Sequence, residues 1–230
     1  MQQNAFPDTP KIRKELIGTC LLLQKDGFFI GTWGNVSVRL EKGFLITPSR
    51  MDYAVMQPDD LVVVSWEGTK LRGQRLPSSE MHLHRLILQK RADLGALVHI
   101  HSPYAMTVAA AQKGIPIFTE EMSQIIGDEV RCTKYIPAGR HLDFANEASE
   151  KIGLSAAVLI ANHGAVVGGR NLGEALAAAQ VLEKAAYIFV HAALVGGFVK
   201  IPEELIREER HRFLYKYGKG DDENDPLSSH

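Results

Sequence analysis

The sequence predicts a single α/β domain, because short apolar runs typical of strands alternate with longer segments of helical periodicity. Residues 96–101 and 156–161 are two such apolar runs. Between residues 10 and 25 the apolar positions fall instead at helical spacing, and Gly27 stands where a C-terminal cap is expected. No internal repeat and no linker interrupts the 230 residues, so we expect one core.

Strands and helices can be placed along the whole chain from these patterns. The predicted strands lie within residues 28–39, 44–47, 61–66, 96–101, 115–118, 130–136 and 156–161. The predicted helices lie near residues 10–25, 76–89, 104–112, 142–152, 171–194 and 203–216. Residues 171–174 have the spacing of a capping box, which predicts where the longest helix begins.

Composition narrows the class of protein. Hydrophobic residues make up 45% of the chain and charged residues 23%, as in ordinary globular proteins. A formal net charge of −1 gives no electrostatic argument for a nucleic-acid or membrane partner. Two cysteines, Cys20 and Cys132, do not make a disulfide framework. With no signal peptide and no plain membrane-spanning run in the sequence, we expect a cytoplasmic protein.

Two of the apolar runs end in histidine. His99 and His101 are two positions apart on a predicted strand, so both side chains point to one face, and Pro103 then ends the strand. An H-x-H pattern alone is more often a pair of hydrogen-bonded histidines than a metal site. The second run, however, ends in His163, with Gly164 directly after it. Three imidazoles delivered to one point are typical of a catalytic divalent metal, most often zinc.

Two other segments are candidates for binding an anion. Gly34–Asn35 is either ordinary turn chemistry or a backbone that a ligand oxygen can approach closely. Ser78 or Ser79 is the natural cap of the helix that follows, and the N–H groups of a first helical turn are a ready anion site. His82 and His84 come next, but on a helix such positions diverge, so we expect packing or surface residues rather than ligands.

Five motifs in the expected order resemble the class II aldolase/adducin family, in particular its fuculose-1-phosphate aldolase branch. They are Gly34-Asn35-Val36-Ser37, Thr47-Pro48-Ser49, Pro77-Ser78-Ser79-Glu80, Val98-His99-Ile100-His101-Ser102 and Asn162-His163-Gly164. The resemblance covers residues 10–218, with residues 1–9 as an N-terminal lead-in and residues 219–230 as an acidic tail expected to be disordered. It implies a three-layer α/β/α fold with a largely antiparallel sheet, and a cyclic homotetramer with active sites between subunits.

The resemblance also implies a reaction, the reversible cleavage of a ketose 1-phosphate into dihydroxyacetone phosphate and an aldehyde. His99, His101 and His163 would bind zinc or another divalent metal, and Glu80 would be the acid/base that also touches the resting metal. Cleavage produces an enediolate, whose charge a Lewis acid stabilises. A carboxylate beside it can move the proton between carbon and solvent.

Substrate contacts follow from the same resemblance. The phosphate would be held by backbone and hydroxyl donors of Gly34, Asn35, Ser49, Ser78 and Ser79. Family members usually have glycine where Arg50 stands, so this arginine either turns to solvent or adds a guanidinium fork to the anion site. They usually carry a tyrosine from the neighbouring subunit where this chain has Glu120 or Glu121. A tail tyrosine is kept as Tyr217 and could close over the site.

Two further functions compete with the aldolase. The same scaffold supports sugar-phosphate epimerases, dehydratases and decarboxylases, although the epimerase branch usually has aspartate at the position of Glu80. A metal-free interaction module like the adducin head would lack the metal ligands. All three histidines are present here, which favours an enzyme.

Overall fold

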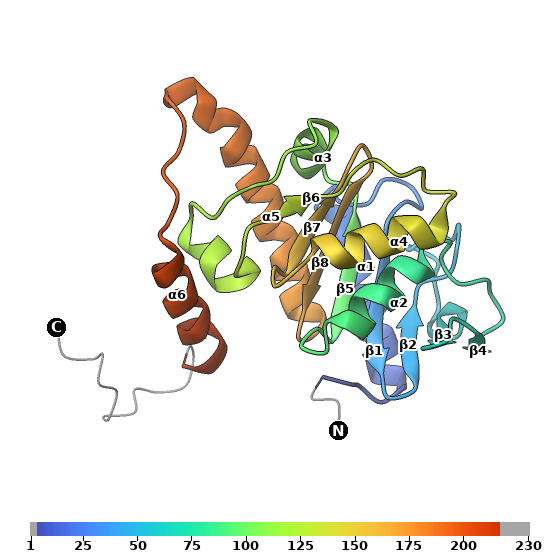
Figure 1. Ribbon diagram of the computed structural model, residues 1–230. Helices are drawn as coiled ribbons and strands as arrows, with labels where there is room; N and C mark the ends of the chain where they lie inside the picture. Colours follow the sequence, from blue (N-terminus) through green and yellow to red (C-terminus); the bar gives the residue numbers. More distant parts are fainter. Residues whose placement is uncertain (1–3, 217–230) are drawn as a thin grey trace.

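The computed structural model describes residues 4–216, which form a mixed sheet with helices on both faces (Figure 1). Its strands are β1 (Asn35–Leu40), β2 (Gly43–Ile46), β3 (Val62–Ser65), β4 (Lys70–Arg72), β5 (Ala96–Ile100), β6 (Arg131–Cys132), β7 (Ala157–Ile160) and β8 (Gly164–Gly169). They lie side by side in the order β4-β3-β2-β1-β5-β8-β7-β6. Among these pairs only β6 and β7 run parallel, which confirms an α/β domain with a largely antiparallel sheet.

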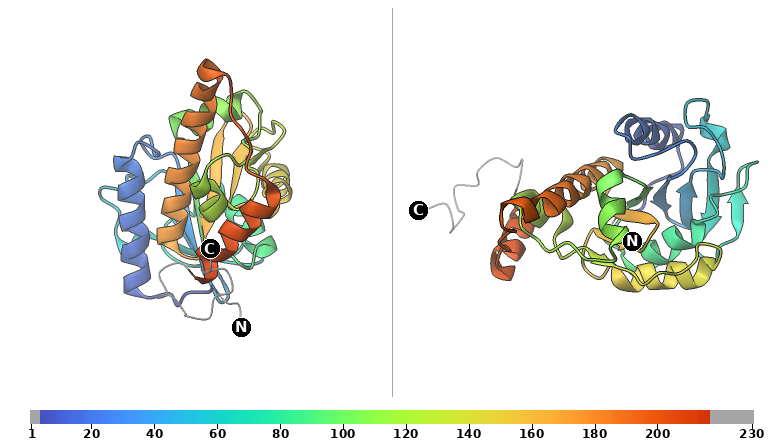
Figure 2. Two further views of the ribbon diagram at one scale, coloured as in Figure 1. Left: turned by 90° about the vertical axis from the view of Figure 1, so that its left-hand side faces the viewer. Right: turned by 90° about the horizontal axis from the view of Figure 1, so that it is seen from above.

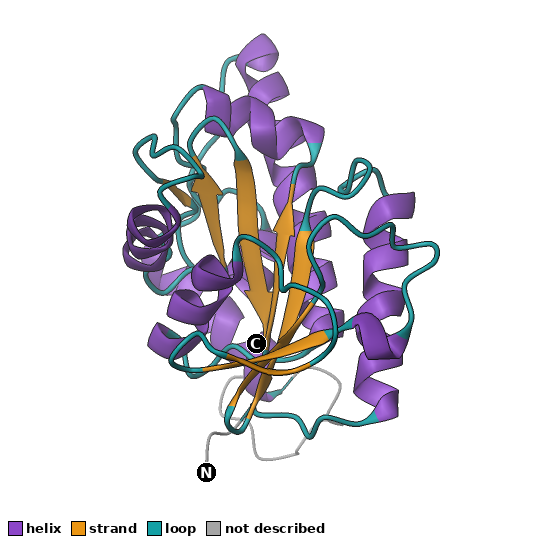
Figure 3. Ribbon diagram, turned by 90° about the vertical axis from the view of Figure 1, so that its right-hand side faces the viewer, coloured by secondary structure: helices purple, strands orange, loops and turns teal. Residues whose placement is uncertain are grey.

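The helices form a layer on each face of the sheet (Figures 2 and 3). They are α1 (Pro10–Lys25), α2 (Met81–Lys90), α3 (Pro103–Ala110), α4 (His141–Lys151), α5 (Leu172–Ala192) and α6 (Glu203–Tyr215). Short helical turns lie at η1 (Pro58–Asp60), η2 (Met122–Ile126) and η3 (Ala193–Val195). Helices α2 and α4 cover one face, and α1, α3 and α5 cover the other.

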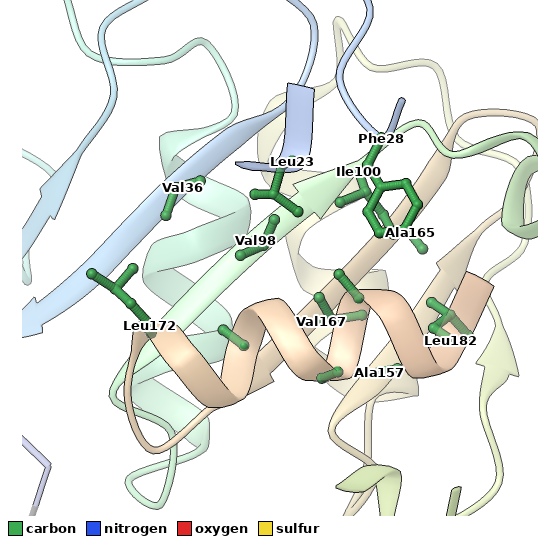
Figure 4. Close-up of a cluster of buried hydrophobic side chains, with 14 of the residues drawn as sticks. Leu23, Phe28, Val36, Val98, Ile100, Ala157, Ala165, Val167, Leu172 and Leu182 are labelled. Carbon is green, nitrogen blue, oxygen red and sulfur yellow. The ribbon is translucent and has the colours of Figure 1, made fainter. Parts of the chain in front are cut away.

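Except for β4 and β6, the strands are buried on both faces of the sheet, so their side chains alternate between two apolar clusters. Val98 of β5 packs with α1 and α5, whereas Leu97 packs with α2 and α4. Figure 4 shows the first cluster, in which Leu23, Val98 and Leu182 come from different elements. Burial of both faces explains why these strands are nearly continuous apolar runs rather than alternating ones.

Helix α5, together with η3, is long and apolar enough to span a membrane by length and composition alone. One of its faces instead packs on the sheet through Ala175, Ala178 and Leu182, all of them fully buried. Small side chains on that face allow the helix to approach the strands closely. We therefore assign α5 as a core helix, and its far end stands clear of the sheet (Figure 1).

The sequence did not indicate β8, because Gly164 was expected to break a strand rather than begin one. In the structure β8 starts at Gly164 and pairs with both β5 and β7. A Cβ atom at Gly164 would lie 2.4 Å from the Ile100 carbonyl oxygen. This glycine therefore permits close approach of two backbones inside a sheet. The strand expected at residues 115–118 is also wrong, since it is reduced to a single bridge between Ile115 and Val130.

The segment before α1 is attached to the domain. Phe6 donates its backbone N–H to the carbonyl of Arg39 at 3.0 Å. The Asp8 carboxylate accepts from Arg13 Nε at 2.6 Å and from Arg13 Nη2 at 2.8 Å. Arg13 also donates to the Pro58 carbonyl at 2.7 Å, so this buried guanidinium joins the segment, α1 and η1.

Candidate metal centre and substrate cavity

Three histidines meet at the ends of the central strands, as the sequence predicts. His99 lies on β5, His101 directly follows it, and His163 occupies the turn between β7 and β8. The Nε2 atom of His99 is 3.0 Å from Nε2 of His101 and 3.1 Å from Nε2 of His163. The candidate ligand atoms of the three residues all lie within 4.8 Å of one another.

The protonation of these rings shows that the cluster fits a cation. The Ala165 carbonyl accepts a hydrogen bond from His99 Nδ1 at 2.9 Å, so a neutral His99 presents an unprotonated Nε2 to the other rings. Burial lowers the pKa of His99 to about 4 and that of His101 to about 3, so both rings are neutral at pH 7. Nitrogen lone pairs directed at one point repel one another, and a divalent metal ion would satisfy all three.

A carboxylate completes the cluster. Glu80 Oε1 lies 3.1 Å from His163 Nε2, and Oε2 lies 3.3 Å from His99 Nε2. Burial raises the pKa of this carboxyl, whereas attraction to the His99 and His163 rings when they are protonated, and the hydrogen bond from the Asn35 amide, lower the pKa below its usual value. Three nitrogens and one carboxylate are a donor set typical of zinc.

Glu80 owes its position to the start of α2. The helix begins at Met81 with Glu80 itself as the N-cap residue, so the expectation that Ser78 or Ser79 caps it is wrong. The Ser78 hydroxyl instead accepts the backbone N–H of Glu80 at 3.3 Å. That contact shapes the turn before the helix and places the carboxylate at its end.

A buried polar network lies behind Glu80. Asn35 Nδ2 donates to Glu80 Oε2 at 2.8 Å, and Asn35 Oδ1 contacts Nε2 of His84. His84 Nδ1 lies 2.6 Å from the Ser37 hydroxyl. His84 is therefore a packing residue, as the sequence suggests, but a fully buried and hydrogen-bonded one.

A cavity of about 460 Å³ opens onto the cluster. Of the residues proposed from the sequence, those lining it are Gly34, Asn35, Ser49, Arg50, Ser79, Glu80, His101 and His163. His99 and Ser78 are buried and do not line it. Sequence reasoning missed the lining residues Thr32, Trp33, Ala138 and Asn162.

Residues 14–190 match the family described as Class II Aldolase and Adducin N-terminal domain. The chain belongs to this family. It is 33% identical to a 5-deoxy-D-ribulose 1-phosphate aldolase of Bacillus thuringiensis, covering 88% of this chain and 95% of that protein. It is 36% identical to an L-fuculose phosphate aldolase of Haemophilus influenzae, covering 90% and 94%. The structure of an L-fuculose 1-phosphate aldolase superposes with a TM-score of 0.85 at 31% identity, covering 90% and 98%. The chain is thus a class II, metal-dependent aldolase.

In this aldolase, strained backbone is concentrated at the cavity. Within residues 4–216, the non-glycine residues with left-handed φ are Arg50 at 57°, Gln112 at 53° and Asn162 at 58°. Arg50 and Asn162 line the cavity, and Gln112 donates to Asn162 Oδ1 at 2.9 Å. Such conformations persist where the surroundings impose them, commonly at functional sites. The left-handed backbone also explains why glycine would suit the position of Arg50.

Several residues that the sequence singled out lie away from this cavity or outside the described part of the chain. Glu121 forms an ion pair with Lys184 at 2.5 Å, and neither Glu120 nor Glu121 lines the cavity. Tyr217 and the tail of residues 219–230 lie outside the residues that the structure describes. Trp33, which the sequence did not suggest, stacks on His101 with ring centroids 6.2 Å apart.

A second cavity of about 360 Å³ lies near α6 and β8. It contains two arginines, but each is bound within the fold. Arg170 pairs with Glu174 at 2.5 Å, and Arg210 donates to the main-chain carbonyls of Gln124 and Ile125. We assign no chemistry to this cavity.

Proposed function

We propose that this protein is a zinc-dependent aldolase that reversibly cleaves a ketose 1-phosphate into dihydroxyacetone phosphate and an aldehyde. The observation that carries the proposal is the meeting of His99, His101 and His163 with the Glu80 carboxylate on the wall of a polar cavity. The names of its relatives support the substrate class, because 5-deoxyribulose 1-phosphate and fuculose phosphate are both ketose phosphates.

The three imidazoles and Glu80 would hold the metal, which supplies Lewis-acid stabilisation of the enediolate charge. Glu80 moves the proton. Its lowered pKa keeps the carboxylate ionised, so in the synthetic direction it can accept a proton from carbon 3 of dihydroxyacetone phosphate. In cleavage the hydroxyl on carbon 4 loses its proton as the bond between carbons 3 and 4 breaks and the aldehyde forms, and Glu80 delivers a proton to carbon 3, so no net proton is consumed.

In this proposal the substrate phosphate binds the hydrogen-bond donors that line the cavity. Ser49, Ser79 and Asn35 are among its lining residues, together with Gly34. Ser78 lies buried behind them, where its hydroxyl supports the Glu80 turn. Arg50 is exposed at the rim and adds a guanidinium, whose fork matches phosphate oxygens in pairs.

The aldehyde part of the substrate would contact other lining residues. Trp33 and Ala138 add apolar surface to the lining, and Asn162 adds one amide. From the family resemblance we also propose that the protein is a cytoplasmic homotetramer with active sites between subunits, and that Tyr217 closes over the site. Light scattering at assay concentration tests the assembly, and an active monomer would remove every cross-subunit role.

The decisive experiment for the reaction is a product assay. We expect the zinc-loaded protein to release dihydroxyacetone phosphate from at least one member of a ketose 1-phosphate panel that includes 5-deoxyribulose and fuculose phosphates. The matched control is Glu80→Gln, which keeps the shape of the side chain but cannot exchange a proton. Conversion of a sugar phosphate to its epimer, or loss of water or carbon dioxide, without dihydroxyacetone phosphate would instead establish another reaction of the same scaffold.

A further inference from the structure

We propose that His84 is a positioning residue that acts through Asn35 to hold the Glu80 carboxylate toward the three histidines. The contacts form an unbroken chain. The Ser37 hydroxyl lies 2.6 Å from His84 Nδ1, His84 Nε2 contacts Asn35 Oδ1, and Asn35 Nδ2 lies 2.8 Å from Glu80 Oε2. Of these four hydrogen-bonded residues, only Asn35 and Glu80 line the cavity, so Ser37 and His84 act through them.

The charge on Glu80, at one end of this relay, fixes which group donates in each of its hydrogen bonds. An ionised Glu80 only accepts hydrogen bonds, so Asn35 must turn its NH₂ group toward it. The Asn35 carbonyl oxygen then faces His84 and requires a proton on Nε2. A neutral ring protonated at Nε2 has an acceptor at Nδ1, and the Ser37 hydroxyl donates to that acceptor.

The other tautomer of His84 would create an unfavourable contact between Asn35 and Glu80. If His84 carried its proton on Nδ1, Nε2 would accept from the Asn35 NH₂ group, and the Asn35 oxygen would face the Glu80 carboxylate. Two acceptors would then oppose each other, and Asn35 is only 4% exposed, so the repulsion between them is costly. At the other end of the relay Ser37 and His84 are fully buried, so water does not replace a hydrogen bond lost there.

The elements of the fold explain why these residues meet. Asn35 and Ser37 are two apart on β1, so their side chains point to the same face. His84 is four residues after Glu80 on α2, one helical turn away, so it lies beneath the carboxylate. Burial also lowers the pKa of His84 to about 4, which keeps the ring neutral at physiological pH.

Three variants separate this role from ordinary packing. His84→Leu removes both hydrogen-bonding atoms of the ring and breaks the relay, Ser37→Ala removes only its first donor, and His82→Leu is the matched control on the same helix outside the relay. Zinc affinity is measured for each protein by competition with a chelating dye at pH 7. We expect His84→Leu to bind zinc about 10–100-fold more weakly, Ser37→Ala to lose less, and His82→Leu to match the wild type.

A double-variant comparison and a tautomer measurement complete the test. If His84 acts through Glu80, His84→Leu should cost no further zinc affinity when Glu80→Ala is already present. Nitrogen-15 NMR of the metal-free protein should show the His84 proton on Nε2. Additive losses of affinity, or a proton on Nδ1, would overturn the proposal. If His84→Leu does not fold, as judged by circular dichroism, Ser37→Ala and the tautomer decide the question.

These measurements need no substrate. The proposal uses the assignment of Glu80 to the metal centre but not the identity of the sugar. Failure of the product assay would therefore leave the relay standing, and failure of the relay would leave the aldolase reaction standing.

Discussion

The inner end of the cavity and its mouth are built differently. At the inner end, Glu80, His84 and His99 lie on strand ends and the start of a helix, and their polar atoms have partners inside the fold. At the mouth, Trp33 is 67% exposed and Arg50 stands on left-handed backbone in a loop.

This difference assigns chemistry and selectivity to different parts of the molecule. The groups that we propose to handle protons and metal are positioned by the same packing that stabilises the core. Groups that meet the variable part of a substrate are carried on loops, where a change of side chain leaves the sheet intact. Variants at the inner end should therefore abolish function, whereas variants at the mouth should tune it.

The largest effect is expected from His101→Ala. The remaining two imidazoles and Glu80 should not retain zinc through dialysis, so bound metal should fall from one ion per chain to near zero. Elemental analysis of the dialysed protein measures this, with His211→Ala on α6 as the control. Equal, stoichiometric metal in the wild type and in His101→Ala would disprove the assignment.

The next effect is expected from Glu80→Gln. The glutamine oxygen can still accept from Asn35, but the side chain cannot carry a proton, so turnover should fall about 10²–10⁴-fold. Circular dichroism should show the fold retained. An unchanged turnover number at saturating substrate would move the acid/base role to another residue.

Substitution of Arg50, at the mouth of the cavity, is expected to have a smaller effect on activity. Arg50→Ala and Arg50→Gly should both raise KM by a factor equivalent to about 1–3 kcal/mol, with little change in turnover. Only glycine relieves the left-handed backbone, so it should be about 1 kcal/mol more stable than the alanine variant. Steady-state kinetics at fixed ionic strength and thermal melts measure the two effects. An unaltered KM in both variants would show that the arginine faces water.

The smallest effect on function is expected from Asp8, which is hydrogen-bonded within the fold but does not line the cavity. Asp8→Asn removes a charge-assisted bond to Arg13 and should lower the free energy of unfolding by about 1–3 kcal/mol at pH 7, with zinc affinity unchanged.

The ion pair between Asp8 and Arg13 also predicts how the free energy of unfolding depends on pH. The hydrogen bond from Arg13 holds the pKa of Asp8 below its usual 3.8, so its stabilisation is complete above that value. It is lost as the pH falls through the lower, folded-state pKa. The difference between wild type and Asp8→Asn in urea unfolding should therefore narrow in acid, and the exposed Asp59→Asn provides the control. A difference that stays constant down to the acid limit would contradict this origin.

The cluster of three histidines could be predicted from the sequence because the patterns that indicate it are local. A period of two places His99 and His101 on one face, and both apolar runs end at a residue that stops or turns the chain. The cap of α5 is equally local, and the structure confirms it, since the Asn171 side chain accepts the Glu174 N–H.

The features that the sequence did not predict depend on contacts between segments that are distant in the sequence. Strand β8 contains three glycines and resembles a turn until its close packing against β5 is seen. The contact between Asn35 and His84 joins positions 49 apart, and neither residue alone indicates it. Arg39 follows the polar side of a strand pattern, yet it is 1% exposed and donates to main-chain carbonyls, including that of Leu94.

The register between the two central strands has a consequence for how activity arises during folding. Asn35 of β1 pairs with His99 of β5. A shift of one residue would turn Asn35 and Ser37 to the opposite face and leave Glu80 without its amide partner. The active centre therefore cannot exist before the two strands have joined in the correct alignment. On refolding, recovery of zinc binding should keep pace with amide protection in β1 and β5, and lag behind the formation of helices.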